Sequence, residues 1–196
     1  MFVGDHAALD FLNTIVGPPF GAVESIANGT AYVHWLAAAG LIDPSEVQEF
    51  LERFGTPALD RMAGEARSLR EWLRQVLTKP AGAHTRLRAA DVAAKLNPIL
   101  ALDCSLRQLE VSGGNLALRE HCEYTRTRQL LVPVAQVIAE LVTDGDPSLI
   151  KCCANPACTL WFYDRTKARR RRFCSADVCG NRAKVAAFRE RQRQSK

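Results

Sequence analysis

Five of the seven cysteines of this 196-residue chain lie within 28 positions near its carboxyl end. Four residues separate Cys153 from Cys158 and Cys174 from Cys179, and fifteen residues lie between the two pairs. Two such pairs can supply the four thiolates of a tetrahedral zinc site, each pair from one tight turn. A segment of about 50 residues buries little apolar surface, so a bound metal is a physically sensible source of stability. We therefore predict one structural zinc ion, held by these four cysteines.

The remaining cysteines leave alternatives open. Cys152 stands beside Cys153, but neighbouring residues of an extended chain point to opposite sides, so both are not expected to bind one ion. We prefer Cys153 because it makes the two pairs equal in length, and we expect Cys152 to pack inward. Cys104 and Cys122 could face each other across a hairpin, although a free cysteine is usually a small buried apolar side chain. An odd total in an intracellular chain argues against a disulfide framework.

Charge divides the chain into two parts. Residues 151–196 carry 13 basic and three acidic residues, a net of +10, whereas residues 1–150 carry 13 basic and 18 acidic residues, a net of −5. An anionic body with a cationic tail indicates two modules, the second of which faces an anion. We place the boundary at the turn Asp144-Gly145-Asp146-Pro147, which predicts one domain over residues 1–146 and a second over 147–196.

The body is predicted to be mainly helical. Apolar residues recur with helical spacing, and the clearest helix start is Asp43-Pro44 with Glu46 as the partner of a capping box. Helices are expected from Asp5 to Ile15, after Thr30, after Asp43, from Thr56 to before Pro80, from about 86 to 102 with Pro98 interrupting, and from about 128 to 143. Short alternating runs on both sides of Gly113-Gly114 predict a β-hairpin. The body is therefore expected to be an α+β domain.

The tail is predicted to be a treble-clef-like zinc finger. The segment between the cysteine pairs alternates well enough for a hairpin, with strands at 160–163 and 171–173 and a turn near 164–168. After Cys179, the Ala-, Arg- and Gln-rich sequence favours a helix. A cysteine turn, a hairpin and a helix that begins at the second cysteine pair form the treble-clef arrangement.

The tail also carries a dense set of basic residues. Arginine suits bidentate contacts with phosphate or guanine, which favours nucleic acid as the partner. A solvated charged surface, or a patch that meets the acidic body, is the alternative explanation. The predicted nucleic-acid-binding residues are Arg169, Arg170, Arg171, Arg172, Arg182, Lys184, Arg189 and Arg193.

In the body, Asp10, Asn13 and Thr14 share one face of the first predicted helix. They could line a pocket for a small molecule, but we favour the interpretation that they bond to neighbouring backbone groups and fix how the helix docks. The chain shows no phosphate loop, nucleophile elbow or dinucleotide fingerprint, so we expect no enzyme. Asp5 and Asp10 interrupt any secretory signal, and residues 25–42 are too polar to span a membrane. We expect a cytoplasmic protein with no membrane partner.

Two stretches resemble known families. The tail resembles the CGNR zinc finger, because Cys179-Gly180-Asn181-Arg182 matches its name-giving tetrapeptide and Phe162-Tyr163-Asp164, Phe173-Cys174-Ser175 and Lys184 match its wider pattern. The amino end resembles the ABATE domain at residues 9–14 and 35–41. This tail departs from the family pattern at Thr166, Ala168 and Phe173. These departures affect the contacts expected at the hairpin tip more than they affect zinc binding.

The resemblance implies a stress-induced transcription regulator of a largely bacterial family, with the finger as the DNA-binding part. It assigns the zinc role to the same four cysteines, and it makes Gly180, Asn181 and Arg182 a helix-start element. We therefore expect a DNA-binding regulator with a structural zinc and an amino-terminal domain for sensing or dimerisation, which admits a homodimer. The alternative is a zinc-stabilised module that binds RNA or an acidic protein and has no direct role on duplex DNA. The sequence does not name a small-molecule ligand.

Overall fold

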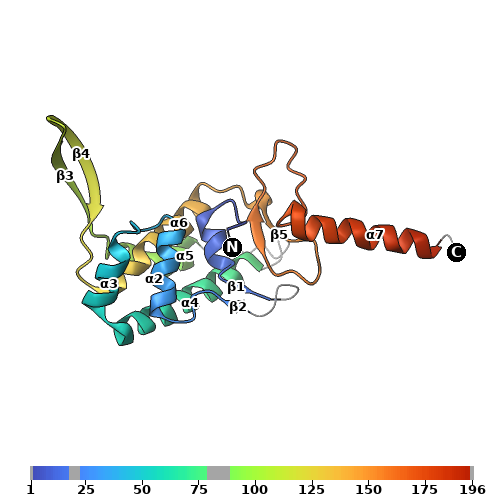
Figure 1. The fold of residues 1–196 in the computed structure, drawn as a ribbon, viewed down its shortest axis with the longest axis horizontal. Helices are drawn as coiled ribbons and strands as arrows, with labels where there is room; N and C mark the ends of the chain where they lie inside the picture. Colours follow the sequence, from blue (N-terminus) through green and yellow to red (C-terminus); the bar gives the residue numbers. More distant parts are fainter. Residues whose placement is uncertain (1, 18–22, 79–88, 195–196) are drawn as a thin grey trace. The chain divides into compact units, whose positions relative to one another are not determined.

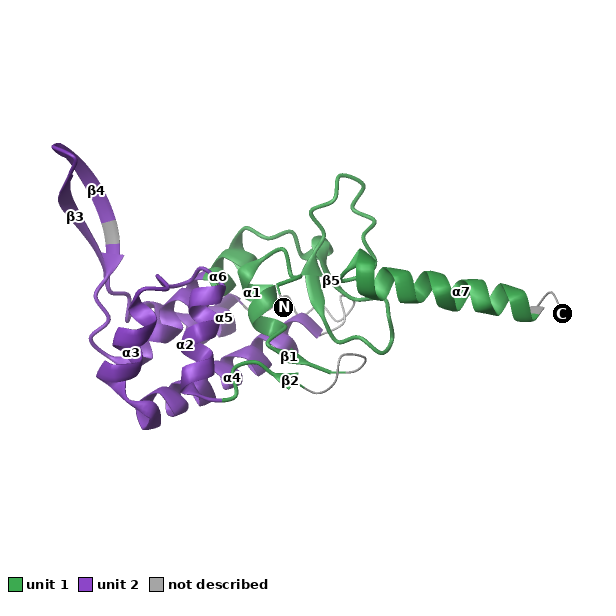
Figure 2. Cartoon of the chain, viewed as in Figure 1, with its two compact units in different colours: residues 1–27, 137–196 green, residues 28–136 purple. Residues whose placement is uncertain are grey.

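The computed structural model describes residues 2–17, 23–78 and 89–194, with only the backbone at 120 and 194. The chain divides into two compact units (Figure 2). The finger unit comprises residues 1–27 and 137–196, and the helical unit comprises residues 28–136. The first 27 residues therefore belong to the same compact unit as the cysteine-rich tail. The boundary predicted after residue 146 separates two sequence modules, which are not the same as these compact units, and it stays a prediction.

The helical unit is built around two packed helices, α2 (Gly29–Ala38) and α4 (Thr56–Thr78) (Figure 1). They approach closely at Gly29, where a Cβ atom would lie 2.4 Å from the Leu59 carbonyl carbon, so no larger residue fits without a shift. The Tyr32 hydroxyl is buried and donates a hydrogen bond to the Leu130 carbonyl at 2.9 Å. The other elements of the unit are α3 (Glu46–Phe54), α5 (Ala89–Leu100), η1 (Thr127–Leu131) and the first part of α6 (Val132–Thr143).

The expected helices are largely present, with three corrections. The capping contact is formed, because the Asp43 amide donates to the Glu46 carboxylate at 3.2 Å, but α3 itself begins at Glu46. Pro98 lies inside α5 and does not interrupt it. The start expected near residue 86 and the break at Pro80 lie outside the described residues. The first helix, α1 (Ala7–Leu12), is shorter than expected because the chain leaves it for β1 (Ile15–Val16), which pairs with β2 (Val23–Glu24).

The hairpin predicted around Gly113-Gly114 is confirmed. Strands β3 (Ser105–Ser112) and β4 (Asn115–Cys122) pair in antiparallel register. The two glycines have φ values of 59° and 82°, the positive pair that a tight two-residue turn requires. Figure 1 shows this hairpin extending away from the helices of its own unit, and we call it the arm.

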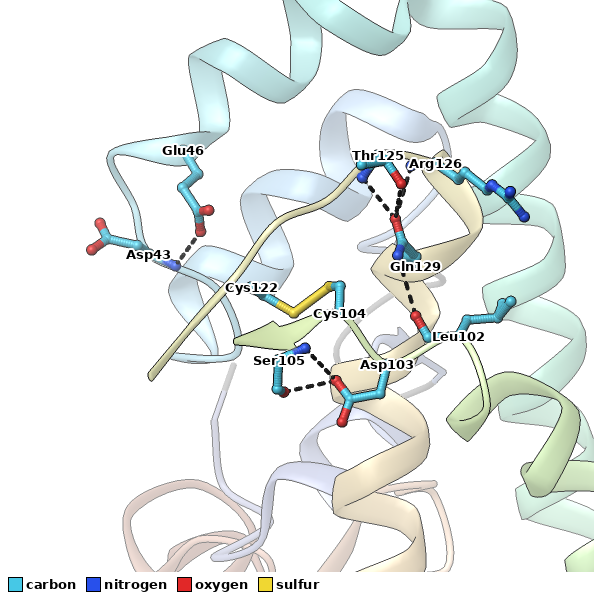
Figure 3. The surroundings of a disulfide bond; sticks show 10 residues. All are labelled: Asp43, Glu46, Leu102, Asp103, Cys104, Ser105, Cys122, Thr125, Arg126 and Gln129. Carbon is cyan, nitrogen blue, oxygen red and sulfur yellow. Dashed lines mark hydrogen bonds between the residues drawn. A yellow bond between two sulfur atoms is a disulfide. The ribbon is translucent and has the colours of Figure 1, made fainter. Parts of the chain in front are cut away.

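A disulfide bond joins Cys104 to Cys122 at the base of the arm (Figure 3). Both residues are only partly buried, so the interpretation of them as free, buried apolar side chains is wrong. The strand register explains the bond, because Cys122 pairs with Ser105, the residue next to Cys104.

Hydrogen bonds support the segments on both sides of this disulfide. The Asp103 carboxylate accepts from the Ser105 amide at 3.0 Å and from its hydroxyl at 2.7 Å. The Gln129 side chain accepts from the backbone amides of Thr125 and Arg126 and donates to the Leu102 carbonyl. Figure 3 shows these two groups of bonds close to the base of the arm.

We predict that replacing Cys104 and Cys122 together by serine lowers the free energy of unfolding of the oxidised protein by about 3 kcal/mol, because the bond closes a loop between residues 18 apart. Denaturant titration of the helical signal measures the change. Reduced wild-type protein serves as the control and should match the double variant. Equal stability of the oxidised wild type and the variant would show that the bond does not constrain the chain.

Candidate metal centre and cationic helix

The zinc-finger part of the finger unit is organised by one short sheet and one helix. Strands β5 (Ile150–Cys152) and β6 (Trp161–Tyr163) pair in antiparallel register. The short helix η2 (Pro147–Leu149) precedes these strands. After them, a single π-helical turn, η3 (Ala176–Gly180), leads into α7 (Asn181–Gln194). The predicted hairpin between 160–163 and 171–173 is wrong, because β6 pairs with β5. Within the described residues, 171–173 form no strand.

The four predicted zinc cysteines lie together. Cys153, Cys158, Cys174 and Cys179 are buried, and their sulfurs all lie within 4.8 Å of one another. The Cys158 and Cys174 sulfurs are 3.8 Å apart. A tetrahedral ion with Zn–S bonds of about 2.3 Å separates its ligands by about 3.8 Å, so the cluster fits one zinc ion. With four thiolates as ligands, no position is left open for water, and the metal is structural.

The electrostatics of the cluster favour a divalent cation. Burial, together with the neighbouring Cys153 sulfur, raises the pKa of Cys158 to about 12. Burial and the Cys158 sulfur also raise the pKa of Cys174. Two N–H groups point at sulfur atoms, from the Cys174 amide to Cys153 at 3.4 Å and from the Asn155 side chain to Cys179 at 3.5 Å. Such outer contacts orient metal-bound thiolates.

The end of β5 determines which of Cys152 and Cys153 points into the cysteine cluster. Cys153 is 7% exposed and lies in the cluster. Cys152 is exposed and pairs in register with Trp161 at the end of β5. The expectation that Cys152 packs inward is therefore wrong, because the residue that points into the cluster turns its neighbour outward.

The amino-terminal segment completes this sheet from its other edge. The Asn13 carboxamide accepts from the Trp161 amide and donates to the Trp161 carbonyl, both at 2.8 Å. Further along β6, the Tyr163 amide donates to the Gly4 carbonyl at 2.8 Å. The pattern lets residues 4–13 serve β6 as a neighbouring strand would. Val16 lies in one apolar cluster with Leu160, Phe162 and the four cysteines.

The other two polar residues of α1 and its end also bond to backbone. The Asp10 carboxylate accepts from the Gly4 amide at 2.8 Å, and the Thr14 hydroxyl donates to the Phe11 carbonyl at 2.8 Å. Burial raises the pKa of Asp10. Asp10, Asn13 and Thr14 are each at most 9% exposed. These contacts are of the kind that the structural interpretation expects, and the small-molecule pocket stays a prediction.

Asp164 is a buried acid that the sequence marks only as the last residue of Phe162-Tyr163-Asp164. Its carboxylate accepts from the Lys151 ammonium at 2.6 Å, from the Arg171 amide at 2.9 Å and from the Thr166 hydroxyl at 2.6 Å. Burial opposes ionisation, but these hydrogen bonds outweigh it and hold the pKa of Asp164 well below its usual range. It folds the segment after β6 into a loop. The available signal was that Asp164 is the single acid between the two cysteine pairs.

The predicted basic residues fall into two groups. The Arg171 guanidinium lies 4.2 Å from the centre of the Phe162 ring, donates to the Val3 and Cys174 carbonyls and pairs with Asp5, so it links the loop to the amino-terminal segment. The side chain of Arg169 is exposed and lies 3.6 Å from Asp146. The other predicted residues are all exposed, and they are Arg170, Arg172, Arg182, Lys184, Arg189 and Arg193.

Comparison with known families agrees with this geometry. Residues 5–145 match the family model ABATE, described as "Putative stress-induced transcription regulator". The chain belongs to the ABATE family. Residues 150–192 of this ABATE chain match the CGNR zinc finger, so the zinc and the predicted fold class, a mainly helical α+β protein with a zinc finger, are confirmed. Neither description is that of an enzyme. No curated protein matches the chain.

One further finding concerns membranes. Among residues 2–17, 23–78 and 89–194, no helix is both long enough and apolar enough to cross a bilayer.

We predict that Cys174→Ser removes bound zinc, because three thiolates cannot close the site. Elemental analysis of purified protein should fall from one zinc per chain to a small fraction. Cys152→Ser is the matched control and should retain one zinc. Loss of zinc from Cys152→Ser with retention in Cys153→Ser would reverse the ligand assignment.

We predict that Asn13→Ala destabilises the zinc-loaded finger unit by about 2–4 kcal/mol, because it breaks two hydrogen bonds and leaves the Trp161 backbone groups unpaired. The midpoint of denaturant-induced zinc release measures this loss. Asn97→Ala, at an exposed position of α5, is the control and should change stability by at most about 0.5 kcal/mol. A release midpoint for Asn13→Ala equal to that of the control would argue against the anchoring role.

Proposed function

We propose that this ABATE protein is a cytoplasmic, stress-responsive transcription regulator whose finger unit binds duplex DNA through α7 and the exposed arginines near the zinc site. The helical unit would supply sensing or dimerisation. The proposal rests on the basic helix α7 and on how little of the described chain packs against it. Beyond η3, no element in the described part of the chain packs extensively against α7.

The composition of α7 suits a polyanion. It contains five basic residues and one acid in 14 residues. An isolated helix of this length is marginal in water, so a partner that binds α7 would also stabilise it. The major groove of B-DNA admits a single α-helix, and arginine on such a helix can contact phosphates and guanine. Because α7 begins at Asn181, two residues after Cys179, zinc binding fixes where this helix starts.

Two surfaces near the metal centre are candidates for phosphate contacts. Arg182 and Arg189, seven residues apart on one face of α7, line a shallow hollow of about 490 Å³ with Val185. A second hollow of about 600 Å³ is lined by Arg170, Arg172 and Lys151 among others. Arg171 also borders it, but its contacts with Asp5 and Phe162 give it a structural role. We therefore assign Arg170 and Arg172, rather than Arg171, to phosphate binding.

The test is a salt series with zinc-loaded, full-length protein and a random-sequence duplex. If several arginines bind phosphates, log K falls with log salt, with a slope of about −0.9 for each phosphate engaged. The double variant Arg182→Ala, Arg189→Ala should weaken binding and reduce the magnitude of that slope by about 2. Arg61→Ala with Lys95→Ala removes two charges from exposed helix positions of the helical unit and should change neither quantity.

The same proteins are titrated with single-stranded RNA of equal length. Binding to RNA without binding to the duplex at low salt would overturn the DNA proposal and favour the alternative, a zinc-stabilised RNA-interaction module. Absence of binding to either nucleic acid would leave an acidic protein as the partner of the basic surface.

A further inference from the structure

The arm of the helical unit carries a cluster of exposed aliphatic side chains. Leu109, Val111, Leu116 and Leu118 are between 63% and 75% exposed. Exposed apolar residues are common one at a time, but a contiguous group on one element indicates a contact surface.

The strand register places these four residues on one face. Leu109 lies opposite Leu118, and Val111 lies opposite Leu116. Because side chains alternate along a strand, both rows project from the same side of the hairpin, which we call the aliphatic face. The next row on this face pairs Arg107 with Glu120.

The opposite face of the arm is different. It carries Leu106, which is 47% exposed, and Ala117, but its other residues are polar, and they are Gln108, Glu110, Ser112, Asn115, Arg119 and His121. The arm therefore has one aliphatic face and one mainly polar face, the pattern of a sheet that packs against a second sheet.

The base and the tip of the arm hold this face in a defined conformation. The Cys104–Cys122 disulfide closes the base, and the two-glycine turn closes the tip (Figures 1 and 3). Asp103 and Gln129 bond to the segments that flank the base. A surface that is ordered before binding loses less conformational entropy when a partner arrives.

We propose that the aliphatic face binds the same face of a second copy of this chain. A two-fold axis parallel to the strands and midway between the two arms lays β3 of one copy over β4 of the other. Leu109 then faces Leu118 of the second copy, and Val111 faces its Leu116. The same rotation brings Arg107 to the register position of Glu120 in the second copy, so the charged row is complementary to itself. A closed two-fold contact of this kind is the commonest form of homodimer.

The charged row distinguishes this arrangement from its reverse. If the tips of the two arms pointed in opposite directions, the aliphatic rows could still meet, but the row of Arg107 would extend past the partner's tip and meet no opposite charge of the second copy. Only the arrangement with both tips in the same direction satisfies the apolar rows and the charged row together.

The exposure of this face suits a dimer contact. All four aliphatic side chains are between 63% and 75% exposed, so a face-to-face contact covers apolar surface in both copies, and the row of Arg107 extends it toward the roughly 1,000 Å² of a specific interface. The proposal gives the helical unit's dimerisation role a surface. It does not depend on DNA binding, because the association is measured without nucleic acid.

The first test measures the mass of zinc-loaded, oxidised full-length protein by sedimentation equilibrium from about 1 to about 100 µM, the range that resolves micromolar affinities. We expect a dimer. Val111→Lys with Leu116→Lys should be monomeric throughout, with a dimer Kd raised at least about 100-fold by buried like charges. Ser112→Lys with Asn115→Lys, which adds the same charge to the opposite face near the tip, should dimerise as the wild type does. Circular dichroism and zinc content verify that each variant is folded.

The second test uses the charged row. Arg107→Glu alone and Glu120→Arg alone each place like charges in both rows of their own homodimer, so each should dimerise about tenfold more weakly. Mixing the two variants should form a heterodimer, because each row then joins opposite charges across the contact. If the charges at positions 107 and 120 interacted only within one arm, mixing the two variants would not produce this heterodimer.

Each outcome decides the proposal. A monomeric wild type at about 100 µM, a dimer that survives Val111→Lys with Leu116→Lys, or equal dissociation of the Ser112→Lys, Asn115→Lys control would overturn the surface. Failure of the mixed charge variants to associate would overturn the arrangement with both tips in the same direction.

Discussion

Four buried cysteine sulfurs within 4.8 Å of one another form a site that favours a bound cation. Burial alone raises the pKa of Cys158, and a second thiolate beside it raises the pKa further. A zinc ion removes this conflict, because its charge compensates the thiolates and its tetrahedral geometry matches their spacing. The turn from Cys153 to Cys158, the η3 turn and the first residue of α7 are all positioned by these ligands. Metal binding is therefore part of the folding free energy of the finger unit, on the order of 10 kcal/mol in comparable small zinc domains.

Contacts other than the metal stabilise both edges of β6. One edge of this strand pairs with β5, and the other is bonded to Asn13 and Gly4, more than 140 residues earlier in the chain. Arg171 strengthens the same connection through Asp5 and the Val3 carbonyl. Asn13, directly after α1, thus provides backbone partners to a strand that would otherwise have an open edge. A finger without residues 1–27 would lack those partners.

The sequence predicts the local features well and the long-range ones poorly. The cysteine spacing identifies the cluster, and Gly113-Gly114 identifies the arm, because each signal lies within a few residues and has one physical meaning. The partner of β6 could not be predicted, because β5 and the segment 171–173 both offer suitable strand residues. Asp164 decides between them by folding the chain after β6 into a loop. The role of Asn13 depends on a contact 148 residues away, and the Cys104–Cys122 bond depends on a register that composition does not encode.

The run Arg169–Arg172 shows why a charge pattern alone overestimates a binding surface. In sequence the four residues are equivalent, yet in the fold Arg171 turns inward over Phe162 while Arg170 and Arg172 stay exposed. The difference has a local cause, because the Arg171 amide is tied to buried Asp164 and this fixes which way its side chain leaves the loop. A guanidinium that already bonds to three carbonyls and a carboxylate would have to give up those bonds to reach a phosphate. We therefore assign the proposed anion binding of the finger unit to the exposed neighbours and to α7, whose first turn is set by the metal.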